Sequence, residues 1–332
     1  MGIIETRGLT KTYVRDFIDV EHGRLRFHLW KRKVSALRNL NLSVEPGEIF
    51  GLLGPNGAGK TTTLKILMGI HFPTSGEATI MGRPLGDREV KSRIGFLPEN
   101  PYFYDYLTGA EFLNFYGQLY GMPRGERNRK IPELLELVGL SQAGKLPLRG
   151  YSKGMNQRIG LAQALLNDPE IVFLDEPQSG LDPLGRKDIR DIILRLREQK
   201  KTVFFSSHIL SDAEMICDRV AILVKGELRN IGALGQLLSA GIKDYEIVVQ
   251  GVSGEVFSAL RPKMKSYLES SDGIMLMAPD EELAREAVRI TLDNHGRLVS
   301  FNPRRETLEE YFISQVRSGD NIPQQAVQGA GK

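Results

Sequence analysis

A glycine-rich loop constrains the fold of this chain more than any other segment. It follows the apolar run 49–53 and precedes the helix-like run 62–67, which is the strand–loop–helix context of a phosphate-binding loop. The loop consists of Gly54, Pro55, Asn56, Gly57, Ala58, Gly59, Lys60 and Thr61. Backbone N–H groups of such a loop surround the α- and β-phosphates of a nucleotide, and the start of the following helix adds a positive dipole end. The sequence therefore predicts a binding site for a nucleoside triphosphate.

Three residues at the end of the loop have predicted roles in that site. Lys60 is expected to reach the β- and γ-phosphates, and the Thr61 hydroxyl is expected to bind Mg²⁺. Thr62, which opens the helix-like run, is included in the predicted nucleotide site. The loop alone does not separate kinases, GTPases, helicases and transport ATPases, so the purpose of triphosphate binding depends on the other motifs.

Two carboxylates follow the apolar run 171–174. Asp175 and Glu176 would lie at the carboxyl edge of the sheet, where ligands of α/β folds bind. Asp175 is expected to hold Mg²⁺ opposite Thr61, and Glu176 to orient and activate the water that attacks the γ-phosphate. A solvated acidic turn is the alternative, and the phosphate-binding loop upstream favours the catalytic interpretation.

The composition excludes several classes of protein. Of the 332 residues, 44 are Lys or Arg and 41 are Asp or Glu, so the charge balance does not indicate a nucleic acid partner. No apolar run approaches the ~18 residues of a membrane-spanning helix, and the N-terminus lacks the pattern of a signal peptide. The single cysteine, Cys217, cannot form an internal disulfide, which suits a reducing cytosol.

Hydrophobic periodicity predicts an α/β fold for residues 1–238. Strand-like pieces from residue 3 to about 44 indicate an antiparallel β-subdomain, and a helical pattern from about 102 to 167 indicates an inserted helical lobe. Short apolar runs that suit a largely parallel sheet occur at 171–174, 202–205 and 220–224, with a helical segment between the first two. We expect a P-loop NTPase core that carries this subdomain and this lobe.

A smaller α/β domain is expected at residues 239–317. Strand-like pieces occur at 245–249, 273–277 and 297–301. Helical patterns occur at 255–267, 281–294 and 306–316. The polar tail 318–332 has too little apolar content to pack, so we expect it to be disordered.

The order of further motifs resembles that of the ATP-binding subunits of ABC transporters. Segment 151–158, Tyr-Ser-Lys-Gly-Met-Asn-Gln-Arg, stands where that family has its signature, usually Leu-Ser-Gly-Gly-Gln followed by a Gln-Arg pair. Ser152 and Gly154 match the pattern, whereas Tyr151, Lys153 and Met155 depart from it. The resemblance implies that Ser152 and Gly154, at a helix N-terminus, close on the γ-phosphate of ATP bound by a partner subunit. Taken alone, Ser152 is a helix N-cap.

The same resemblance implies roles for three other residues. His208 follows the strand-like run 202–205 as the family's switch histidine does, and would contact the γ-phosphate and help hold the attacking water. Tyr13 resembles the aromatic residue on which adenine stacks, although an aromatic at a strand end commonly only packs. Glu99 replaces the glutamine that in the family touches Mg²⁺ and the water, and its carboxylate can also bind the metal. Segment 179–182 resembles the loop that contacts the second subunit.

Two segments are candidates for contact with a membrane subunit. Aromatic residues are dense in the first part of the helical lobe, namely Tyr102, Phe103, Tyr104, Tyr106, Phe112, Phe115, Tyr116 and Tyr120. At least half should pack in the lobe, while those at 102–106 suit the groove that in this family receives a helix of the membrane subunit. Residues 14–33 form an insertion that reads either as a solvated hairpin around His22 and Gly23 or as a basic, aromatic contact with the membrane or its subunit.

Together these motifs indicate an ATP-binding and ATP-hydrolysing subunit of an ABC transporter. The expected catalytic residues are Lys60, Glu176 and His208, with ATP and Mg²⁺ as cofactors. The expected partners are an integral membrane permease and a second ATP-binding subunit, in a homodimer at the cytoplasmic face of the membrane. The segment 307–313 ends a region that resembles the C-terminal extension of bacterial drug-resistance and sodium-efflux ATPases, which favours export.

Two alternatives use the same nucleotide chemistry. A soluble ATPase that acts on DNA or the ribosome would require a long coiled-coil insertion or a second nucleotide-binding domain, and the sequence contains neither. A regulatory ATPase would use the C-terminal domain to bind a ligand. Removal of the residues after about Leu238 would separate this alternative from the transporter subunit.

Overall fold

The computed structural model of the protein describes residues 2–14, 18–21, 24–27, 33–238 and 242–313. The chain divides into two compact units, Met1–Leu234 and Gly235–Lys332. The boundary predicted from the sequence follows residue 238, four residues further along the chain. The predicted tail 318–332 lies outside the described residues.

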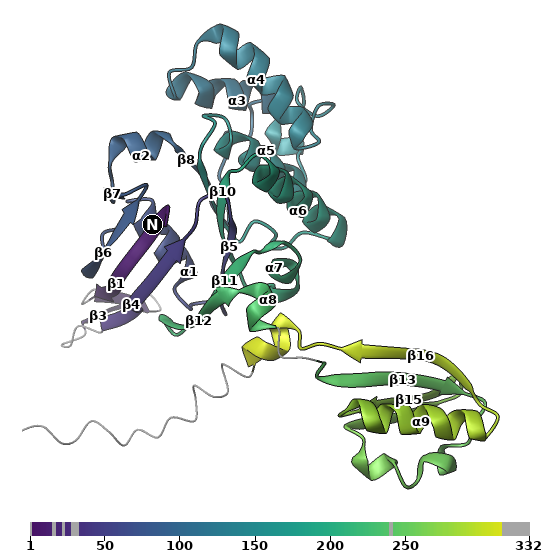
Figure 1. The fold of residues 1–332 in the computed structure, drawn as a ribbon. Helices are drawn as coiled ribbons and strands as arrows, with labels where there is room; N and C mark the ends of the chain where they lie inside the picture. The colour runs from purple at the N-terminus through teal and green to yellow at the C-terminus, as the bar shows by residue number, and fades with distance from the viewer. Residues whose placement is uncertain (1, 15–17, 22–23, 28–32, 239–241, 314–332) are drawn as a thin grey trace, which may run out of the picture. The chain divides into compact units, whose positions relative to one another are not determined.

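A six-stranded sheet in the order β12-β11-β5-β10-β9-β8 forms the core of the first unit (Figure 1). Its strands are β5 (Ile49–Leu53), β8 (Ile94–Leu97), β9 (Ile171–Asp175), β10 (Thr202–Ser207), β11 (Arg219–Val224) and β12 (Glu227–Ala233). Only the edge strand β12 runs antiparallel to its neighbour within this sheet. Every residue of β5, β9 and β10 is buried, as expected for strands covered on both faces. The predicted parallel core is confirmed, and it brings the carboxyl ends of β5, β10 and β9 side by side.

The predicted antiparallel β-subdomain is a second sheet in the order β4-β1-β6-β7. Its strands are β1 (Ile4–Val14), β4 (Lys33–Val44), β6 (Ser75–Ile80) and β7 (Arg83–Pro84). Helix α1 (Lys60–Leu67) contacts β4 of this sheet and also β9 and β10 of the parallel sheet. One apolar core therefore includes Leu9 of β1, Phe50 of β5 and Leu64 of α1, all fully buried. Because burial of such a side chain stabilises by roughly 1.5–3 kcal/mol, this core holds α1 firmly between the sheets.

The insertion at residues 14–33 contains a β-hairpin. Strand β2 (Ile18–Glu21) pairs with β3 (Arg24–Phe27) in antiparallel register, with Glu21 opposite Arg24. The predicted hairpin is confirmed for these two strands, while the choice between a solvated hairpin and a contact with the membrane or its subunit stays a prediction. Residues 15–17, 22–23 and 28–32 lie outside the described part of the chain.

The remaining helices of the first unit include the predicted helical lobe. They are α2 (Arg88–Ser92), α3 (Gly109–Leu119), α4 (Arg124–Leu137), the 3₁₀ turn η1 (Leu148–Gly150), α5 (Lys153–Ala164), α6 (Pro183–Glu198) and α7 (Leu210–Ile216). Thr108 and Glu111 form a capping box that defines the start of α3. Helices α5, α6 and α7 cover the face of the parallel sheet opposite α1 (Figure 1). Both faces of the core sheet are thus shielded from water.

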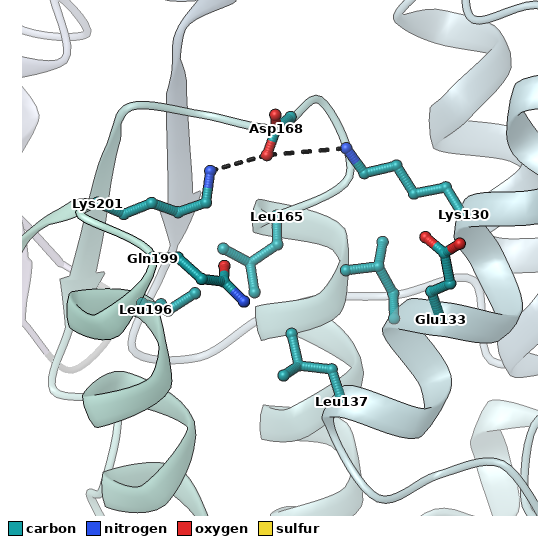
Figure 2. A pocket seen from close by; sticks show the side chains of 9 residues that line it. Lys130, Glu133, Leu137, Leu165, Asp168, Leu196, Gln199 and Lys201 are labelled. Carbon is teal, nitrogen blue, oxygen red and sulfur yellow. Dashed lines mark hydrogen bonds and ion pairs between the residues drawn. The ribbon is translucent and has the colours of Figure 1, made fainter.

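Three charged side chains, Lys130, Asp168 and Lys201, link the lobe helix α4 to the parallel core, and we call this group the clasp (Figure 2). Asp168, in the loop between α5 and β9, accepts a hydrogen bond of 2.7 Å from Lys201 and lies 4.0 Å from the ammonium of Lys130 on α4. The hydrogen bond from Lys201 is the main cause of the lowered pKa of Asp168. Leucines from three helices line the cavity of about 240 Å³ below the clasp, and they are Leu134, Leu137, Leu165 and Leu196. The clasp therefore ties the lobe to the core at one end of this cavity.

The second unit contains a four-stranded antiparallel sheet in the order β14-β15-β13-β16. The elements of the unit are η2 (Gly254–Phe257), η3 (Arg261–Lys263), α9 (Glu281–Asp293), β13 (Asp244–Gln250), β14 (Ser266–Ser270), β15 (Gly273–Ala278) and β16 (Arg297–Arg304). Helix α8 (Leu234–Leu237) precedes them, and residues 308–313 form a last helical turn. Together with the chain order, this strand order is that of a ferredoxin-like βαββαβ unit whose first helix is reduced to 3₁₀ turns.

The predicted helix at residues 255–267 is wrong. Residues 254–257 and 261–263 form separate 3₁₀ turns, and residues 266–270 form the edge strand β14 beside β15. Pro262 lacks the N–H that a helix interior requires, and pairing with β15 satisfies the backbone of β14 instead. The predicted helices at 281–294 and 306–316 agree with α9 and with the turn at 308–313, and residues 314–316 lie outside the described chain.

Candidate active site

The glycine-rich loop connects the carboxyl end of β5 to the start of α1. Gly54 leaves the sheet where a Cβ atom would lie 2.2 Å from the carbonyl oxygen of Leu223. Gly59 caps α1 with φ of 106°, and a Cβ atom there would lie 2.4 Å from the carbonyl oxygen of Ala36. Both positions therefore require glycine, because a side chain would collide with backbone that the loop must approach.

The ammonium of Lys60 is buried inside this loop. It donates hydrogen bonds to the carbonyl oxygens of Gly54 and Pro55, at 2.7 and 3.2 Å. It also lies 3.0 Å from Oε1 of Glu176 in an ion pair whose two side chains are 5% and 7% exposed. A buried charge needs such partners because it has lost its hydration. Lys60 is thus held at the mouth of the loop, within reach of the second carboxylate of the acidic pair.

Asp175 accepts hydrogen bonds from two hydroxyl groups. Its Oδ1 atom lies 3.1 Å from the Thr61 hydroxyl and 2.6 Å from the Ser206 hydroxyl. Burial raises the pKa of the Asp175 carboxyl, the bonds from Ser206 and Thr61 oppose the rise, and the nearby charge of Glu176 adds to it. A cation bound next to Asp175 would offset the free-energy cost of burying the negative charge of its carboxylate.

Glu176 adopts an uncommon backbone conformation at the end of β9. Its φ of 49° lies in the left-handed region, which costs a residue other than glycine about 1–2 kcal/mol. Its N–H donates to the Ser206 hydroxyl at 3.0 Å, and its Oε2 atom lies 2.7 Å from Nδ1 of His208. Such strain persists where surrounding contacts hold it in place, and it is typical of functional sites. The carboxylate of Glu176 therefore bridges Lys60 on one side and His208 on the other.

A cavity of about 310 Å³ opens in front of these groups. Its lining residues are Ala36, Asn56, Gly57, Gly59, Lys60, Thr61, Thr62, Glu99 and Glu176. The structure thus brings together most of the predicted nucleotide site, including the unusual Glu99, which is exposed to solvent. Pro55 and Ala58 belong to the same loop, and Ala58 packs into the core. A cation, loop N–H groups and a carboxylate around one cavity can bind a phosphate chain and activate a water molecule.

Asp175 and His208 lie behind this cavity and contact its lining residues Thr61 and Glu176, whereas Tyr13, Ser152 and Gly154 belong neither to the lining nor to the phosphate-binding loop. Ser152 caps α5 and accepts a hydrogen bond of 3.2 Å from the N–H of Met155, and Gly154 lies in the first turn of that helix. Tyr13 lies near the end of β1, and its hydroxyl is 2.7 Å from Nδ1 of His71. Their predicted roles therefore depend on a second subunit or on a base that extends beyond the phosphates.

Ser206 is a site residue that the sequence analysis did not assign. It is fully buried and contacts both members of the acidic pair. The sequence contains one indication that Ser206 belongs to the site, because this residue lies two positions before His208 at the end of a strand-like run. Because the pairing of β9 with β10 sets Ser206 opposite Asp175, the role of the hydroxyl depends on strand order.

The aromatic residues of the lobe fall into two groups. Phe112 is fully buried, and its ring packs 4.6 Å from that of Phe103, whereas Tyr102 is 98% exposed and Tyr106 is 68% exposed. A surface cavity of about 450 Å³ is lined by residues 101–106 together with Leu148, Arg149, Tyr151 and Asn156. The exposed tyrosines therefore border a hollow that could receive another molecule.

No helix among the described residues has the length and apolar character needed to cross a bilayer. Within the same residues, no three His, Cys, Asp or Glu side chains converge in a way that could hold a metal ion.

Comparison with known proteins agrees with this geometry. Residues 37–179 match the family model for ABC transporters. An uncharacterised ABC transporter ATP-binding protein of Synechocystis is 47% identical over 95% of this chain and 85% of its own length. The bacitracin transport ATP-binding protein BcrA of Bacillus licheniformis is 35% identical over 86% of this chain and 93% of its own. A dimeric ATP-binding cassette solved in a post-hydrolysis state with ADP and phosphate is 26% identical, with a TM-score of 0.60 over 70% of this chain and 98% of its own.

These similarities extend beyond the loop and the acidic pair to almost the whole chain. Subunits of this kind bind and hydrolyse ATP, dimerise and work with membrane permease components. The chain belongs to the family of ABC transporter ATP-binding subunits and is an ATPase.

Proposed function

We propose that this chain powers an exporter, as a homodimer at the cytoplasmic face of the membrane that drives a separate permease. One observation carries the proposal: Lys60, Thr61 and Glu176 line one cavity, and contacts of 2.7 to 3.1 Å join Asp175 to Thr61, Glu176 to Lys60 and His208 to Glu176. Similarity to a bacitracin transport protein and the exporter-like C-terminal region support export as the direction. The charge balance of the chain gives no support for a nucleic acid partner.

Binding of ATP would rearrange the contacts of Lys60. Phosphate oxygens can replace the carbonyl oxygens of Gly54 and Pro55 as acceptors for its ammonium, because a charged acceptor forms the stronger hydrogen bond. Glu176 would then be free to accept a proton from the attacking water while the water oxygen bonds to the γ-phosphorus and the bond to the β-phosphate oxygen breaks. His208 would steady Glu176 and contact the γ-phosphate.

The oxygen atoms beside the loop suit Mg²⁺. Thr61 and Asp175 already touch at 3.1 Å, and Glu99 lines the same cavity. Mg²⁺ prefers oxygen ligands and usually combines one or two carboxylates with phosphate oxygens and waters. These residues would hold the ion, which when bound neutralises charge on the phosphates.

Ser152 and Gly154 would complete the site of the second subunit. The first turn of α5 contains no acidic residue, so its N-terminus presents N–H groups and a positive dipole end to an anion. Within one chain these residues do not line the cavity around Lys60. ATP would therefore be bound between the loop of one subunit and α5 of the other.

A mixed-dimer experiment tests this arrangement. Gly154→Asp places a carboxylate that suits the helix N-terminus but repels a γ-phosphate, and a Cβ atom there meets nothing closer than 3.8 Å. Each homodimer, Gly154→Asp or Lys60→Ala, should be inactive. The mixed dimer should regain activity, because one of its two sites combines an intact loop with an intact α5. Lack of activity in mixed dimers, shown to form by differential tagging, would contradict sites shared between subunits.

The permease contact is assigned to the hollow beside Tyr102 and Tyr106. Amphipathic aromatic side chains are enriched at protein interfaces, and these two are largely exposed. Purification of the tagged chain from membranes should recover an integral membrane protein. Recovery should fall with Tyr102→Ala and Tyr106→Ala combined, and not with the control Leu292→Ala, which removes an exposed apolar side chain from α9. Equal recovery with both variants would place the contact elsewhere.

A further inference from the structure

A hydrogen bond links the predicted adenine-stacking residue to the helix that carries the phosphate site. The hydroxyl of Tyr13 lies 2.7 Å from Nδ1 of His71, and the two rings meet edge to face with centroids 5.9 Å apart. His71 follows α1 and donates its backbone N–H to the carbonyl oxygen of Lys65, in the last turn of that helix. Lys60 and Thr61 stand at the other end of the same helix. His71 therefore connects Tyr13 to the end of α1 that lies opposite Lys60 and Thr61.

Strand pairing brings the backbone of Tyr13 near one wall of the cavity. It is paired with Val34 of β4, and Ala36, two residues further along β4, lines the cavity. Val34 is 42% exposed, so the strand pair presents apolar surface next to the loop. The ammonium of Lys11 lies 5.1 Å from the centre of the Tyr13 ring, a cation–π contact. A purine whose phosphates occupy the loop could thus reach this ring.

We propose that His71 is a positioning residue for base recognition, because it holds the ring of Tyr13 in the plane on which adenine stacks. This inference rests on the proposed role of Tyr13 in ATP binding. A tyrosine rotates about two side-chain bonds, and a bond at its hydroxyl restricts both. Binding to a ring that is already oriented loses less conformational freedom, so the tether strengthens ATP binding without any contact between His71 and ATP.

The local backbone has other connections, so the His71 ring can be changed without loss of the fold. The ammonium of Lys11 donates to the carbonyl oxygen of Phe72 at 2.6 Å. The N–H of Thr74 donates to the carbonyl oxygen of Thr10 at 2.8 Å, and the N–H of Thr12 donates to the Thr74 hydroxyl at 3.0 Å. These bonds hold the segment after α1 against β1 when the ring is absent.

Tyr13→Ala, which removes the ring, and four further variants of the full chain test the tether. His71→Leu removes the bonding nitrogen, Tyr13→Phe removes the hydroxyl and keeps the ring, and the double variant removes both. His71→Asn keeps a polar group near the position of Nδ1. Equilibrium binding is measured for ATP and for inorganic tripolyphosphate, which has no base, and kcat and KM are measured for ATP hydrolysis.

The loss of one hydrogen bond should weaken ATP binding about threefold to tenfold in His71→Leu and in Tyr13→Phe. The double variant should be no weaker than either single variant, because both remove the same bond. His71→Asn should bind ATP within about twofold of the wild-type chain. Tripolyphosphate affinity and kcat should stay at wild-type values in His71→Leu, with the whole effect in KM.

Two results would overturn the assignment of His71. The first is an equal loss of affinity for ATP and tripolyphosphate, which would mean that His71 supports α1 and the phosphate site. The second is wild-type ATP affinity in His71→Leu while Tyr13→Ala binds ATP weakly. If Tyr13→Ala itself leaves ATP affinity unchanged, the stacking role of Tyr13 fails, and the role of His71 fails with it.

Discussion

Lys60 and Glu176 form a buried ion pair, with 3.0 Å between Nζ and Oε1. The expected phosphate-binding cation and the expected catalytic carboxylate are therefore in direct contact. If one member of the pair is removed, the other keeps partners, namely the carbonyl oxygens of Gly54 and Pro55 for Lys60 and His208 for Glu176. Phosphate oxygens bound in the loop would compete with Glu176 for Lys60, so we expect ATP binding to change the contacts of the proposed catalytic base.

Glu176→Gln should preserve ATP binding and lower turnover by roughly 100- to 10,000-fold, the usual effect of losing a catalytic base. The amide can still accept from Lys60 and donate to His208, so the fold should be retained. The variant should also accumulate as an ATP-bound dimer, which size-exclusion chromatography with and without ATP would detect. Glu133→Gln, an exposed change on α4, serves as the control. Turnover at the normal rate would remove Glu176 from its role.

Lys60→Ala should weaken nucleotide binding itself. A hydrogen bond from a charged group contributes about 1.5–3 kcal/mol, so the Kd for ATP should rise by roughly 10- to 100-fold. Equilibrium binding of a fluorescent ATP analogue measures the change. Lys65→Ala changes the same residue type in the last turn of α1 and should leave the Kd near that of the wild type. An unchanged Kd for Lys60→Ala would count against the loop as the phosphate site.

Asp175→Asn should abolish ATP hydrolysis without lowering the stability of the nucleotide-free protein. Burial raises the pKa of Asp175 in the folded state, so the folded chain binds a proton more tightly than the unfolded chain does. Tighter proton binding by the folded chain adds to the free energy of unfolding at pH values below the pKa that Asp175 has in the unfolded chain. This contribution is lost as pH rises through the higher pKa that Asp175 has in the folded chain. Ionised Asp175 therefore opposes folding at neutral pH.

Asp175→Asn removes the free-energy cost of burying an ionised carboxylate. The amide oxygen of the asparagine can still accept hydrogen bonds from Thr61 and Ser206. The melting temperature at pH 7 should equal or exceed that of the wild type, and it should fall less than that of the wild type as pH rises above the ordinary pKa of an aspartate. Thermal unfolding at several pH values, without nucleotide or Mg²⁺, gives the comparison. A markedly lower melting temperature at pH 7 would show that the ionised carboxylate stabilises the fold.

Glu99→Gln should retain ATP hydrolysis and require more Mg²⁺. Removal of one carboxylate next to a cation in a solvent-accessible site weakens binding by about 1 kcal/mol, which is roughly fivefold. ATPase rates measured across a Mg²⁺ titration at saturating ATP would reveal the shift in half-maximal concentration. Glu89→Gln, an exposed residue of α2, is the matched control. Identical Mg²⁺ dependence of Glu99→Gln and wild type would mean that Glu99 does not contribute to metal binding.

The sequence by itself determined the chemistry of this protein and most of its elements. The loop at 54–61, the acidic pair and the periodicity of the buried strands are local patterns, and strands and helices form where such patterns occur. Local patterns gave a wrong prediction where they suit both a helix and other structures. Residues 255–267 carry apolar residues at helical spacing, yet Pro262 and pairing with β15 divide the segment into 3₁₀ turns and a strand.

Only the tertiary structure decided which distant residues act on each other. Pairing of β9 with β10 sets Ser206 against Asp175, and packing of α1 between two sheets brings His71 to Tyr13. The ion pair of Lys60 with Glu176 likewise joins a loop and a strand end that are far apart in the chain. Such contacts depend on strand order and helix packing, which result from burial of the whole core and are not encoded near either residue.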